Sequence, residues 1–407
     1  MRYLLLPALL VLFTTASAQY KADNVKYTTV YPPDLCKTLA ANPGFVLLDV
    51  RSQGEFDDTL SSSPGLNIGH IKGAMHIDIR ELPNRWRELL AYKDKPLFIY
   101  CSHSQRSRRA SRLLSDSGFT RIFNVNQGLT GFYIDGIDKK KCNSYTIETN
   151  LPYNIVSPAE LDQNWSKKVS FAIIDIREDS AYNGTTSSGS INAHGRFANA
   201  THIPLSQLAT SLSKVPKNIS VLIVDDYGDQ SPVAAKLLHD NGYTNVYILF
   251  NGMEEWVDHT TEFAKAIGTP WKPGVSYRFL SAGEFAARVS AGVIPTIIDV
   301  RTADEFNNQS KNYWQNIGQV KGAINIPSAE VSSQLSALPS SKNAPLVIYG
   351  FNNNDYVYAA AAALKQAGYT NISLVRGGIW TLRWASHNIA GKASLEKVVI
   401  NVPESNL

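Results

Sequence analysis

The sequence predicts an α/β protein of three tandem domains, each a parallel β-sheet with helices on both faces. One observation is a repeat, in which similar segments recur 126 and then 124 residues apart: LLDVRSQGEF from Leu47, IIDIREDSAY from Ile173 and IIDVRTADEF from Ile297. A glycine recurs at similar steps, in NVNQGL, ILFNGM and LVRGGI, at Gly128, Gly252 and Gly378. Short apolar runs also alternate with helical patterns, which is typical of a parallel sheet.

The first element expected in each copy of the repeat is a helix. An acidic residue lies fifteen positions before each repeated aspartate, at Asp34, Glu160 and Glu284. In the second and third copies this residue closes a capping box that begins at Ser157 and at Ser281. In such a box a hydroxyl and a carboxylate bind the free N–H groups at a helix start. We therefore expect each copy to open with a helix.

Strands and a second helix follow in a fixed order. The run that ends in the repeated aspartate, and the runs LFIY, VLIV and LVIY from Leu97, Val221 and Leu346, are apolar and too short for buried helices. Each of the latter leads through a polar loop into a helical pattern with a glycine at its end, at Gly118, Gly242 and Gly368. A last apolar run, at residues 122–125, 246–249 and 372–375, predicts a further strand in each copy.

The repeats place the domains at residues 19–148, 149–272 and 273–407, after a signal peptide at residues 1–18. Arg2, an apolar run and the pattern Ala16-Ser17-Ala18 predict this peptide. The run is shorter than the roughly 20 residues that cross a bilayer, and no such run follows. We therefore expect a periplasmic or secreted protein with no membrane span in the mature chain, and an uncleaved anchor is the alternative.

Residues 183–195, NGTTSSGSINAHG, are rich in glycine, serine and threonine. This composition predicts a mobile surface loop in the second domain. Such a loop either covers a site or is simply solvated.

The composition argues against several kinds of partner. The 407 residues carry 39 basic and 35 acidic side chains, a net charge of +4 without a long basic block, so we expect no nucleic-acid partner. Eight histidines and three cysteines show neither CxxC nor HExxH spacing, so we expect no metal site. The sequence contains no glycine-rich nucleotide loop, and we expect no cofactor.

The three cysteines remain after cleavage of the signal peptide. In an oxidising compartment an odd number suggests one disulfide and one free thiol. Cys36 and Cys142 flank the first repeat, whereas Cys101 lies in a polar loop, so we pair the outer two. Three free thiols are the alternative.

The polar loop CSHSQRS, from Cys101 to Ser107, is the candidate active site. Ligands bind beyond the carboxyl ends of parallel strands, and Cys101 directly follows the strand expected at residues 97–100. Burial would raise the pKa of the thiol, but the following helix start and Arg106 would lower it. We expect the lowering to prevail, so that Cys101 is a thiolate able to attack a sulfur or phosphorus centre.

The rest of the loop can bind the anionic oxygens of a substrate. Arg106 and the backbone amides supply positive charge, and hydroxyl donors come from three serines, Ser102, Ser104 and Ser107. His103 either assists a proton transfer or simply faces solvent, and Gln105 completes the loop.

The segments DVRSQGEF, GHIKGAMHI, CSHSQRS and NVNQGL, in this order, resemble the rhodanese family of sulfurtransferases over nearly all of the chain. The resemblance implies that Cys101 attacks a sulfane sulfur, as in thiosulfate, and becomes a persulfide. The sulfur then passes to cyanide or to a thiol, and a small molecule or a partner protein supplies this acceptor. The loop from Ser102 to Ser107 would hold the donor. The resemblance also implies structural roles for four residues, Asp49, Arg51, Glu55 and His70.

Two features of the loop bear on this resemblance. Ser104 stands where single-domain members often have glycine, so a positive φ there would be strained. Phosphatases of the same fold have one more residue between the cysteine and the arginine. Here four residues separate Cys101 from Arg106, which favours sulfur transfer over the chemistry of a phosphatase or an arsenate reductase.

The second and third copies lack the nucleophile. Asp225 aligns with Cys101 and Gln230 with Arg106. In the third copy Gly350, or Phe351 if the gap is moved, takes the place of the cysteine, and no arginine follows. We expect neither copy to be catalytic. Three roles remain open for these copies: packing partners that shape the entrance over Cys101, docking surfaces for an acceptor protein, or relics. For the whole chain, the alternative to an enzyme is a non-catalytic binding or scaffold protein.

Overall fold

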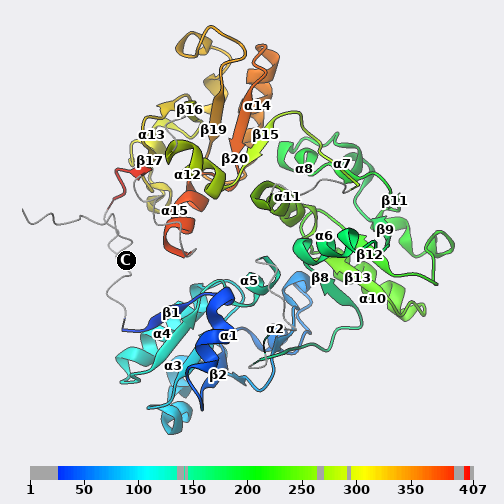
Figure 1. Cartoon of the computed structure of the whole chain (residues 1–407), viewed down its shortest axis with the longest axis vertical. Coiled ribbons are helices and arrows are strands. Elements are labelled where there is room, and N and C mark those ends of the chain that lie inside the picture. Colours follow the sequence, from blue (N-terminus) through cyan, green and yellow to red (C-terminus); the bar gives the residue numbers. More distant parts are fainter. Residues whose placement is uncertain are drawn as a thin grey trace, which may run out of the picture.

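The structure is a computed structural model that describes residues 26–134, 142, 145–263, 270–290, 295–388 and 398–403. It contains three copies of one α/β unit, arranged around a common centre (Figure 1). The predicted signal peptide lies outside the described residues. Among the helices that are described, none is both long enough and apolar enough to span a membrane.

The first copy contains a five-stranded parallel sheet with the strand order β1-β6-β5-β2-β4. Helices α1 and α5 pack on one face through Leu35 and Phe132, and α3 and α4 cover the other face through Leu82 and Leu114. The elements, in which η denotes a 3₁₀ helix, are β1 (Thr28–Val30), α1 (Pro32–Ala40), β2 (Val46–Asp49), α2 (Gln53–Phe56), η1 (Pro64–Leu66), β3 (His70–Ile71), β4 (Met75–His76), α3 (Leu82–Arg85), η2 (Trp86–Tyr92), β5 (Leu97–Tyr100), α4 (Gln105–Asp116), β6 (Ile122–Val125), α5 (Gly128–Ile134) and β7 (Ile147–Glu148).

The second copy repeats this order as β8-β13-β12-β9-β11, again with all strands parallel. Its faces are covered by α6 and α11, through Leu161 and Trp256, and by α9 and α10, through Leu208 and Leu238. The elements are β8 (Asn154–Val156), α6 (Pro158–Ser166), β9 (Ala172–Asp175), α7 (Asp179–Asn183), α8 (Gly189–Ala193), β10 (Arg196–Phe197), β11 (Thr201–His202), α9 (Leu205–Leu208), η3 (Leu212–Lys214), β12 (Val221–Val224), α10 (Ser231–Asp240), β13 (Val246–Leu249), α11 (Gly252–Phe263) and β14 (Trp271–Lys272).

The third copy has the order β15-β20-β19-β16-β18. Helices α12 and α15 pack on one face through Phe285 and Leu382, and α14 packs on the other through Leu364. The elements are β15 (Arg278–Leu280), α12 (Ala282–Ser290), β16 (Thr296–Asp299), α13 (Ala303–Phe306), η4 (Tyr313–Gln315), β17 (Gln319–Val320), β18 (Ile324–Asn325), η5 (Ser328–Glu330), η6 (Leu335–Ala337), β19 (Leu346–Tyr349), α14 (Asp355–Gln366), β20 (Ile372–Val375), α15 (Gly378–Asn388) and β21 (Val399–Ile400). The predicted fold of three parallel sheets with helices on both faces is confirmed.

The opening of each copy differs from the prediction. A three-residue strand, β1, β8 or β15, precedes the helix and pairs with the edge of the sheet. Three residues are too few to show a strand pattern in the sequence. The two predicted capping boxes are confirmed, since Glu160 N donates to Ser157 Oγ at 3.1 Å and Glu284 N donates to Ser281 Oγ at 3.1 Å.

The prediction of a mobile loop at residues 183–195 is wrong, because this segment contains α8 and packs against the third copy. The Ser188 hydroxyl caps α8 by accepting a hydrogen bond from Ile191 N at 3.3 Å. The Asn192 side chain accepts from Thr186 N at 2.9 Å. Ala193 is fully buried in the core of the third copy. Several of the small polar residues therefore hold the segment in place by binding one another and the backbone.

A buried ion pair ends the first long strand of each copy. Asp49 and Arg51 are fully buried, and their Oδ2 and Nη2 atoms lie 2.8 Å apart. Arg51 Nη2 also donates to Gly69 O at 2.7 Å, which ties the strand end to the turn before β3. The same contacts recur in the other copies, for Asp175, Arg177 and Gly195 and for Asp299, Arg301 and Gly318.

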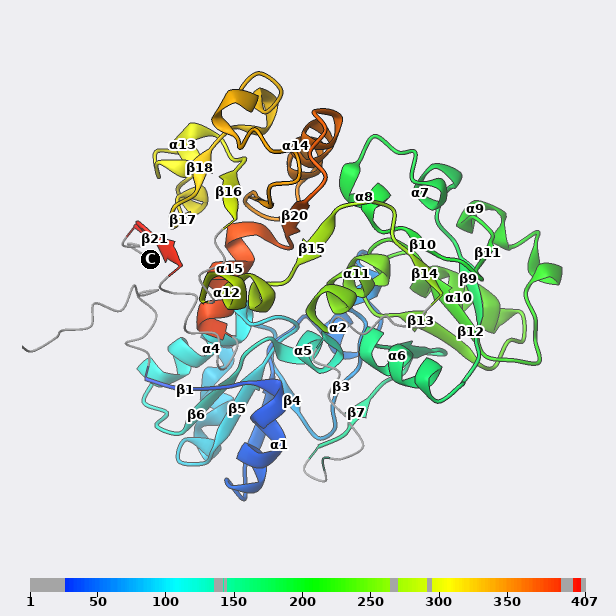
Figure 2. The same ribbon diagram turned by 45° about the horizontal axis from the view of Figure 1, so that its top comes forward.

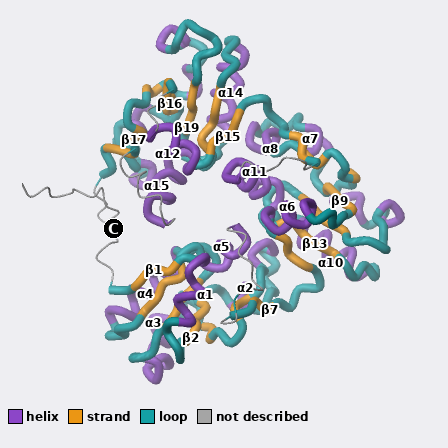
Figure 3. Tube along the Cα trace, viewed as in Figure 1, coloured by secondary structure: helices purple, strands orange, loops and turns teal. Residues whose placement is uncertain are grey.

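Consecutive copies pack through a repeated helix contact. The last helix of one copy lies against the first helix of the next, so that α5 contacts α6 and α11 contacts α12. Figure 3 shows these helices, together with α15, around the centre of the molecule.

A second repeated contact borders the loop after the second long strand. Gly65 of η1 lies against the second copy, where a Cβ atom on Gly65 would be 2.9 Å from Gly228 O. At the next junction α8 lies beside α14 (Figure 2). There Ser188 Oγ and Ser190 N donate to Asp355 Oδ1 at 2.8 and 3.1 Å. The loops of the second and third copies are thus bordered by the copy before them.

A disulfide joins α1 to the segment after α5. Cys36 and Cys142 are bonded, with their Cα atoms 5.6 Å apart, and Cys101 is a free, buried cysteine. The bond joins residues 106 positions apart in the sequence. In the chain-entropy model a loop of this length stabilises the folded state by at most about 4–5 kcal/mol.

We predict that loss of this bond destabilises the first copy by about 2–4 kcal/mol. The measurement is urea unfolding of a Cys101→Ser variant, in which the disulfide cysteines are the only thiols left, with and without reductant. Mass spectrometry of the non-reduced protein should show a Cys36–Cys142 peptide. A disulfide that contains Cys101 would contradict the pairing.

Candidate active site

Cys101 lies at the carboxyl end of β5, the central strand of the first sheet, and its side chain is only 1% exposed. Its carbonyl oxygen accepts a hydrogen bond from Leu129 N at 2.9 Å. The Ser102 carbonyl accepts from Thr130 N at 3.0 Å and from Thr130 Oγ1 at 2.9 Å. Because the C=O and N–H groups of a trans peptide point in opposite directions, the next N–H groups face away from α5.

Gly128 allows the backbone at the start of α5 to lie directly against the backbone of the loop at Cys101 and Ser102. It has a φ of +53°, and a Cβ atom on it would lie 2.0 Å from Cys101 O. A side chain would therefore collide with the backbone of the loop, and its conformation would also be strained. The repeated glycine of the sequence thus marks the point where the last helix begins against the loop.

The backbone amides of residues 102–107 are available to an anion. Among the described residues none of these six N–H groups donates a hydrogen bond to a protein acceptor, and the first bond of α4 runs from Arg108 N to Ser104 O at 3.0 Å. Free N–H groups at a helix start favour negative charge. Ser107 Oγ lies 3.6 Å from Cys101 Sγ. We call these six groups the loop amides.

Arg106 is held by Glu55 of α2. Arg106 Nη1 and Nη2 lie 2.5 and 2.7 Å from the Glu55 carboxylate oxygens, and Nη2 also donates to Ser102 Oγ at 2.7 Å. Burial raises the pKa of Glu55, but hydrogen bonds from Arg106 and Ser52 outweigh it and hold this pKa below its usual range. The guanidinium therefore positions the loop in this structure, and its charge remains close to Cys101.

The other loop residues differ in their exposure to solvent. His103 and Gln105 are exposed, and the three loop serines are buried. His103 Nδ1 lies 2.9 Å from Ser102 Oγ. The pKa of His103 is below its usual value, mainly because surrounding protein atoms displace water from the ring and, to a smaller extent, because the positive charge of Arg106 repels a proton. Ser104 has a φ of 163°, which lies outside the left-handed region that favours glycine, so the strain expected for serine at this position does not arise.

The four residues expected to have structural roles bind different parts of the first copy. Glu55 contacts the loop through Arg106. The Asp49 and Arg51 side chains bind each other, and Arg51 also binds the turn at Gly69. His70 Nδ1 lies 3.1 Å from Phe56 O, and the two rings stack.

In the second copy a carboxylate occupies the loop. Asp225 O accepts from Met253 N at 2.8 Å, the equivalent of the bond from Leu129 to Cys101, so Asp225 stands at the cysteine position. Its carboxylate accepts from Gly228 N at 2.9 Å, from Gln230 N at 2.7 Å, and from Ser231 through N at 3.1 Å and Oγ at 2.8 Å. Burial raises the pKa of Asp225 despite these bonds.

In the third copy the loop is closed by side chains of α14. Gly350 O accepts from Ile379 N at 3.0 Å, which places Gly350 at the cysteine position. A Cβ atom on Gly350 would lie 2.4 Å from Val357 Cγ2, and the Tyr356 hydroxyl accepts from Phe351 N at 2.7 Å. A cysteine at this position would not fit without movement of α14.

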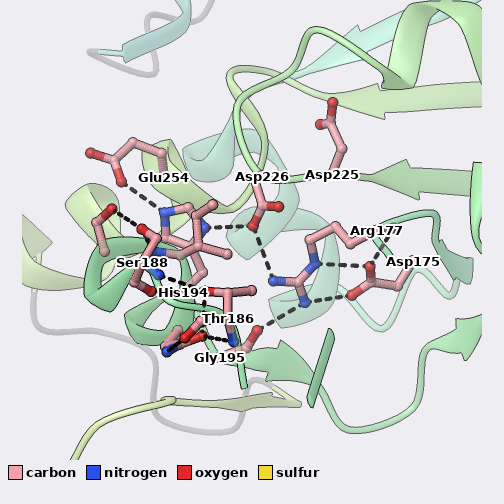
Figure 4. Close-up of polar contacts among 12 residues, drawn as sticks. Asp175, Arg177, Thr186, Ser188, His194, Gly195, Asp225, Asp226 and Glu254 are labelled. Carbon is pink, nitrogen blue, oxygen red and sulfur yellow. Dashed lines mark hydrogen bonds and ion pairs between the residues drawn. The ribbon is translucent and has the colours of Figure 1, made fainter. Parts of the chain in front are cut away.

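The sequence analysis did not find a buried charged cluster between the second and third copies. Figure 4 shows the chain of contacts from Arg177 through Asp226 and His194 to Glu254. His194 is fully buried, with Nδ1 2.8 Å from Asp226 and Nε2 2.9 Å from Glu254. Glu254 then pairs with Arg376 of the third copy at 2.8 Å. The partners lie far apart in the sequence, so no local motif indicates the cluster.

A cavity of about 400 Å³ lies beside this cluster, at the third loop and not at Cys101. Tyr227 and Glu254 of the second copy and Trp380 of the third are among its lining residues. Its walls hold no cysteine, and its charged group is a carboxylate, so it does not offer the chemistry expected of the first loop.

The fold and the loop define a class of α/β domains that carry a cysteine loop at the carboxyl edge of a parallel sheet. The chain belongs to the family of rhodanese-like domains, because the model of this family matches residues 32–135, 157–259 and 281–381, more than half of the chain. The three matches coincide with the three copies of the repeat.

Several known proteins are similar to parts of this chain. YqhL of Bacillus subtilis is 38% identical over 82 residues, which are 20% of this chain and 56% of that protein. Thiosulfate sulfurtransferase GlpE of Stutzerimonas stutzeri is 29% identical over 97 residues, 24% of this chain and 77% of GlpE. The tRNA uridine(34) hydroxylase of an Enterobacter species is 25% identical over 92 residues, 22% of this chain and 24% of the hydroxylase. The crystal structure of a Pseudomonas aeruginosa thiosulfate sulfurtransferase is 16% identical, with a TM-score of 0.22 over 86% of this chain and 66% of that one.

We predict that Gly128→Ala costs about 1–3 kcal/mol more stability than Gly73→Ala. Both glycines have a positive φ, of +53° and +76°, so both variants introduce backbone strain. A Cβ atom meets nothing within 4 Å at Gly73, but it meets Cys101 O at Gly128. Urea unfolding of the two variants measures the difference, and equal losses would refute the argument from the close approach.

We predict that the stabilisation by His194 falls as pH rises. Burial lowers the pKa of His194, but Asp226 and Glu254 raise it more, so the folded-state pKa is above the unfolded value of about 6.5. The contribution is therefore complete below about pH 6.5 and is lost as pH rises through the folded-state pKa. Burial and the nearby Asp258 also raise the pKa of Glu255, to about 8, which changes stability in the same direction.

The measurement is thermal unfolding of the wild type and of His194→Asn between pH 6 and 9. The variant keeps Glu255, so the difference between the two proteins isolates the histidine. This difference should shrink towards high pH. A difference that does not change with pH would show that folding does not raise the pKa of His194, and a difference that grows with pH would show that folding lowers it.

Proposed function

We propose that the protein is an exported sulfurtransferase, in which Cys101 carries a sulfane sulfur from a donor such as thiosulfate to a thiol or to cyanide. The supporting observation is the loop of the second copy, where N–H groups of Gly228, Gln230 and Ser231 bind the carboxylate of Asp225. The loop of this fold therefore binds an anion at the cysteine position. In the first copy the equivalent N–H groups belong to Ser104, Arg106 and Ser107.

The first step of the proposed reaction is attack by the Cys101 thiolate on the outer sulfur of thiosulfate. A bond forms between the two sulfurs, the original sulfur–sulfur bond breaks, and its electron pair leaves with sulfite. The product is a persulfide on Cys101, whose negative charge the loop amides stabilise. In the second step an acceptor thiolate or cyanide attacks the outer sulfur, and Cys101 leaves as a thiolate.

The burial of Cys101 favours a small donor. With 1% of the side chain exposed, the donor must place its outer sulfur within the loop. Once the persulfide forms, its outer sulfur lies about 2 Å beyond Sγ, the length of a sulfur–sulfur bond. The acceptor can therefore be larger than the donor. We propose that His103 lies beside the path by which the acceptor reaches the persulfide, because it is an exposed residue of the loop.

The loop length and the pairing of Arg106 with Glu55 support the proposal of sulfur transfer over phosphate or arsenate chemistry. Four residues separate Cys101 from Arg106, and Glu55 binds the guanidinium at 2.5 and 2.7 Å. A phosphate would have to compete with this carboxylate for Arg106. We propose that Arg106 acts mainly through the position and charge of the loop.

The proposed export rests on the predicted signal peptide, and the disulfide between Cys36 and Cys142 supports it. Disulfides persist in oxidising compartments and are rare in the cytosol. We therefore propose a periplasmic or secreted location, which a fractionation of the producing cells tests directly.

We predict that thiosulfate adds one sulfur atom to Cys101 and that Cys101→Ser abolishes the thiosulfate-dependent formation of thiocyanate from cyanide. The measurements are intact-protein mass spectrometry and the rate of thiocyanate formation. The matched controls are Cys36→Ser/Cys142→Ser, which should keep the activity, and Asp225→Asn, which should not change it. A wild type as inert as Cys101→Ser towards thiosulfate, mercaptopyruvate and persulfide donors would favour the binding or scaffold protein.

A further inference from the structure

The start of α4 is an interface position that no described element of the chain fills. The residue thirteen positions before the helix-ending glycine is Gln105 in the first copy, Asp229 in the second and Asp355 in the third. Asp229 borders Gly65 of the preceding copy, and Asp355 accepts three hydrogen bonds from Ser188 and Ser190 of the preceding copy. No copy of the repeat precedes the first one in the described chain, and Gln105 is exposed.

The same side of α4 carries an arginine stripe. Gln105, Arg108, Arg109 and Arg112 are spaced as i, i+3, i+4 and i+7, which places them on one side of the helix. Arg109 and Arg112 are exposed, and neither forms an ion pair with a described residue. We call these four residues the α4 face.

This face is more positive than its counterparts. At the position of Gln105 the second and third copies each have an aspartate. At the positions of the three arginines the second copy has one lysine, Lys236, and the third copy has no charged residue. The acidic residue of α4, Asp116, lies 3.4 Å from Lys26, which balances its charge. Arg109 and Arg112 therefore give the α4 face positive charge that no ion pair among the described residues neutralises.

We propose that the α4 face is the docking site of an acidic protein that carries a thiol and takes the sulfur from Cys101. This inference rests on the proposed function. Opposite charge favours encounter and fixes orientation. Helix α4 begins four residues after Cys101, so a partner on its first two turns has its own surface beside the loop.

A second copy of this chain fits the face less well. The element that would occupy the face is η4, the counterpart of η1 and α8, with Tyr313 and Trp314 exposed by 71% and 52%. The exposed Lys311 lies two residues before η4 and would bring positive charge to the arginines. Like charges across an interface disfavour association.

The test uses two synthetic peptides of equal length, each with one cysteine, one carrying four glutamates and the other four glutamines. The protein is first loaded with sulfur from thiosulfate, and the transfer of sulfur to each peptide is measured at low salt. We expect transfer to the glutamate peptide to be at least about tenfold faster. Salt at about 0.5 M should remove this preference, because it screens exposed charges.

The variant is Arg109→Glu/Arg112→Glu. The matched control is Arg121→Glu, an exposed arginine that directly precedes β6, at the amino end of the strands and away from the loop. The double variant should lose the preference, and the control should keep it. Loading by thiosulfate should be the same in all three proteins. Equal rates with the two peptides, or the same loss in Arg121→Glu, would overturn the proposal.

A binding experiment separates this proposal from the proposed function. Fluorescence anisotropy with labelled peptides in which serine replaces cysteine reports docking without sulfur transfer. If Cys101 does not load but the glutamate peptide binds through Arg109 and Arg112, the function fails and the surface stands. If analytical ultracentrifugation shows self-association that the double variant abolishes, a second copy occupies the face and the proposal is overturned.

Discussion

The contact between the start of the last helix and the residue after the second long strand determines the geometry of all three loops. In the first copy it consists of the bonds from Leu129 N to Cys101 O and from Thr130 N to Ser102 O. The glycine at the helix start lets the two backbones meet, and the same pair of bonds recurs in the other copies. Because these bonds hold the carbonyls on one side, the amides that follow are left for another acceptor.

The three copies differ in what satisfies those amides. In the second copy the acceptor is the carboxylate of Asp225, and in the third the hydroxyl of Tyr356 binds the first amide of the loop. Unpaired buried N–H groups cost stability, so a side chain that fills the loop stabilises a copy that has no cysteine there. In the first copy the same position holds the thiol of Cys101, and the amides remain available to a substrate.

The sequence was sufficient to predict the repeat, the sheets and the position of Cys101, because these depend on local apolar patterns and on a fixed loop. It was not sufficient for β1, β8 and β15, which are edge strands of three residues. The helix α8 was missed because its small polar residues are typical of loops, although here they cap the helix and bind Asp355. The pairing of Arg106 with Glu55 and of Glu254 with Arg376 depends on tertiary contacts, to which no sequence spacing points.

The way in which each copy borders the loop of the next gives the array a direction. Residues of η1 lie at the second loop and residues of α8 lie at the third, so each unit narrows access to the unit after it. Lengthening the array after residue 403 would leave Cys101 as accessible as it is now. A fourth unit joined ahead of β1 in the same manner would cover it. Gene duplication in this architecture can therefore add units at one end without covering Cys101, but not at the other.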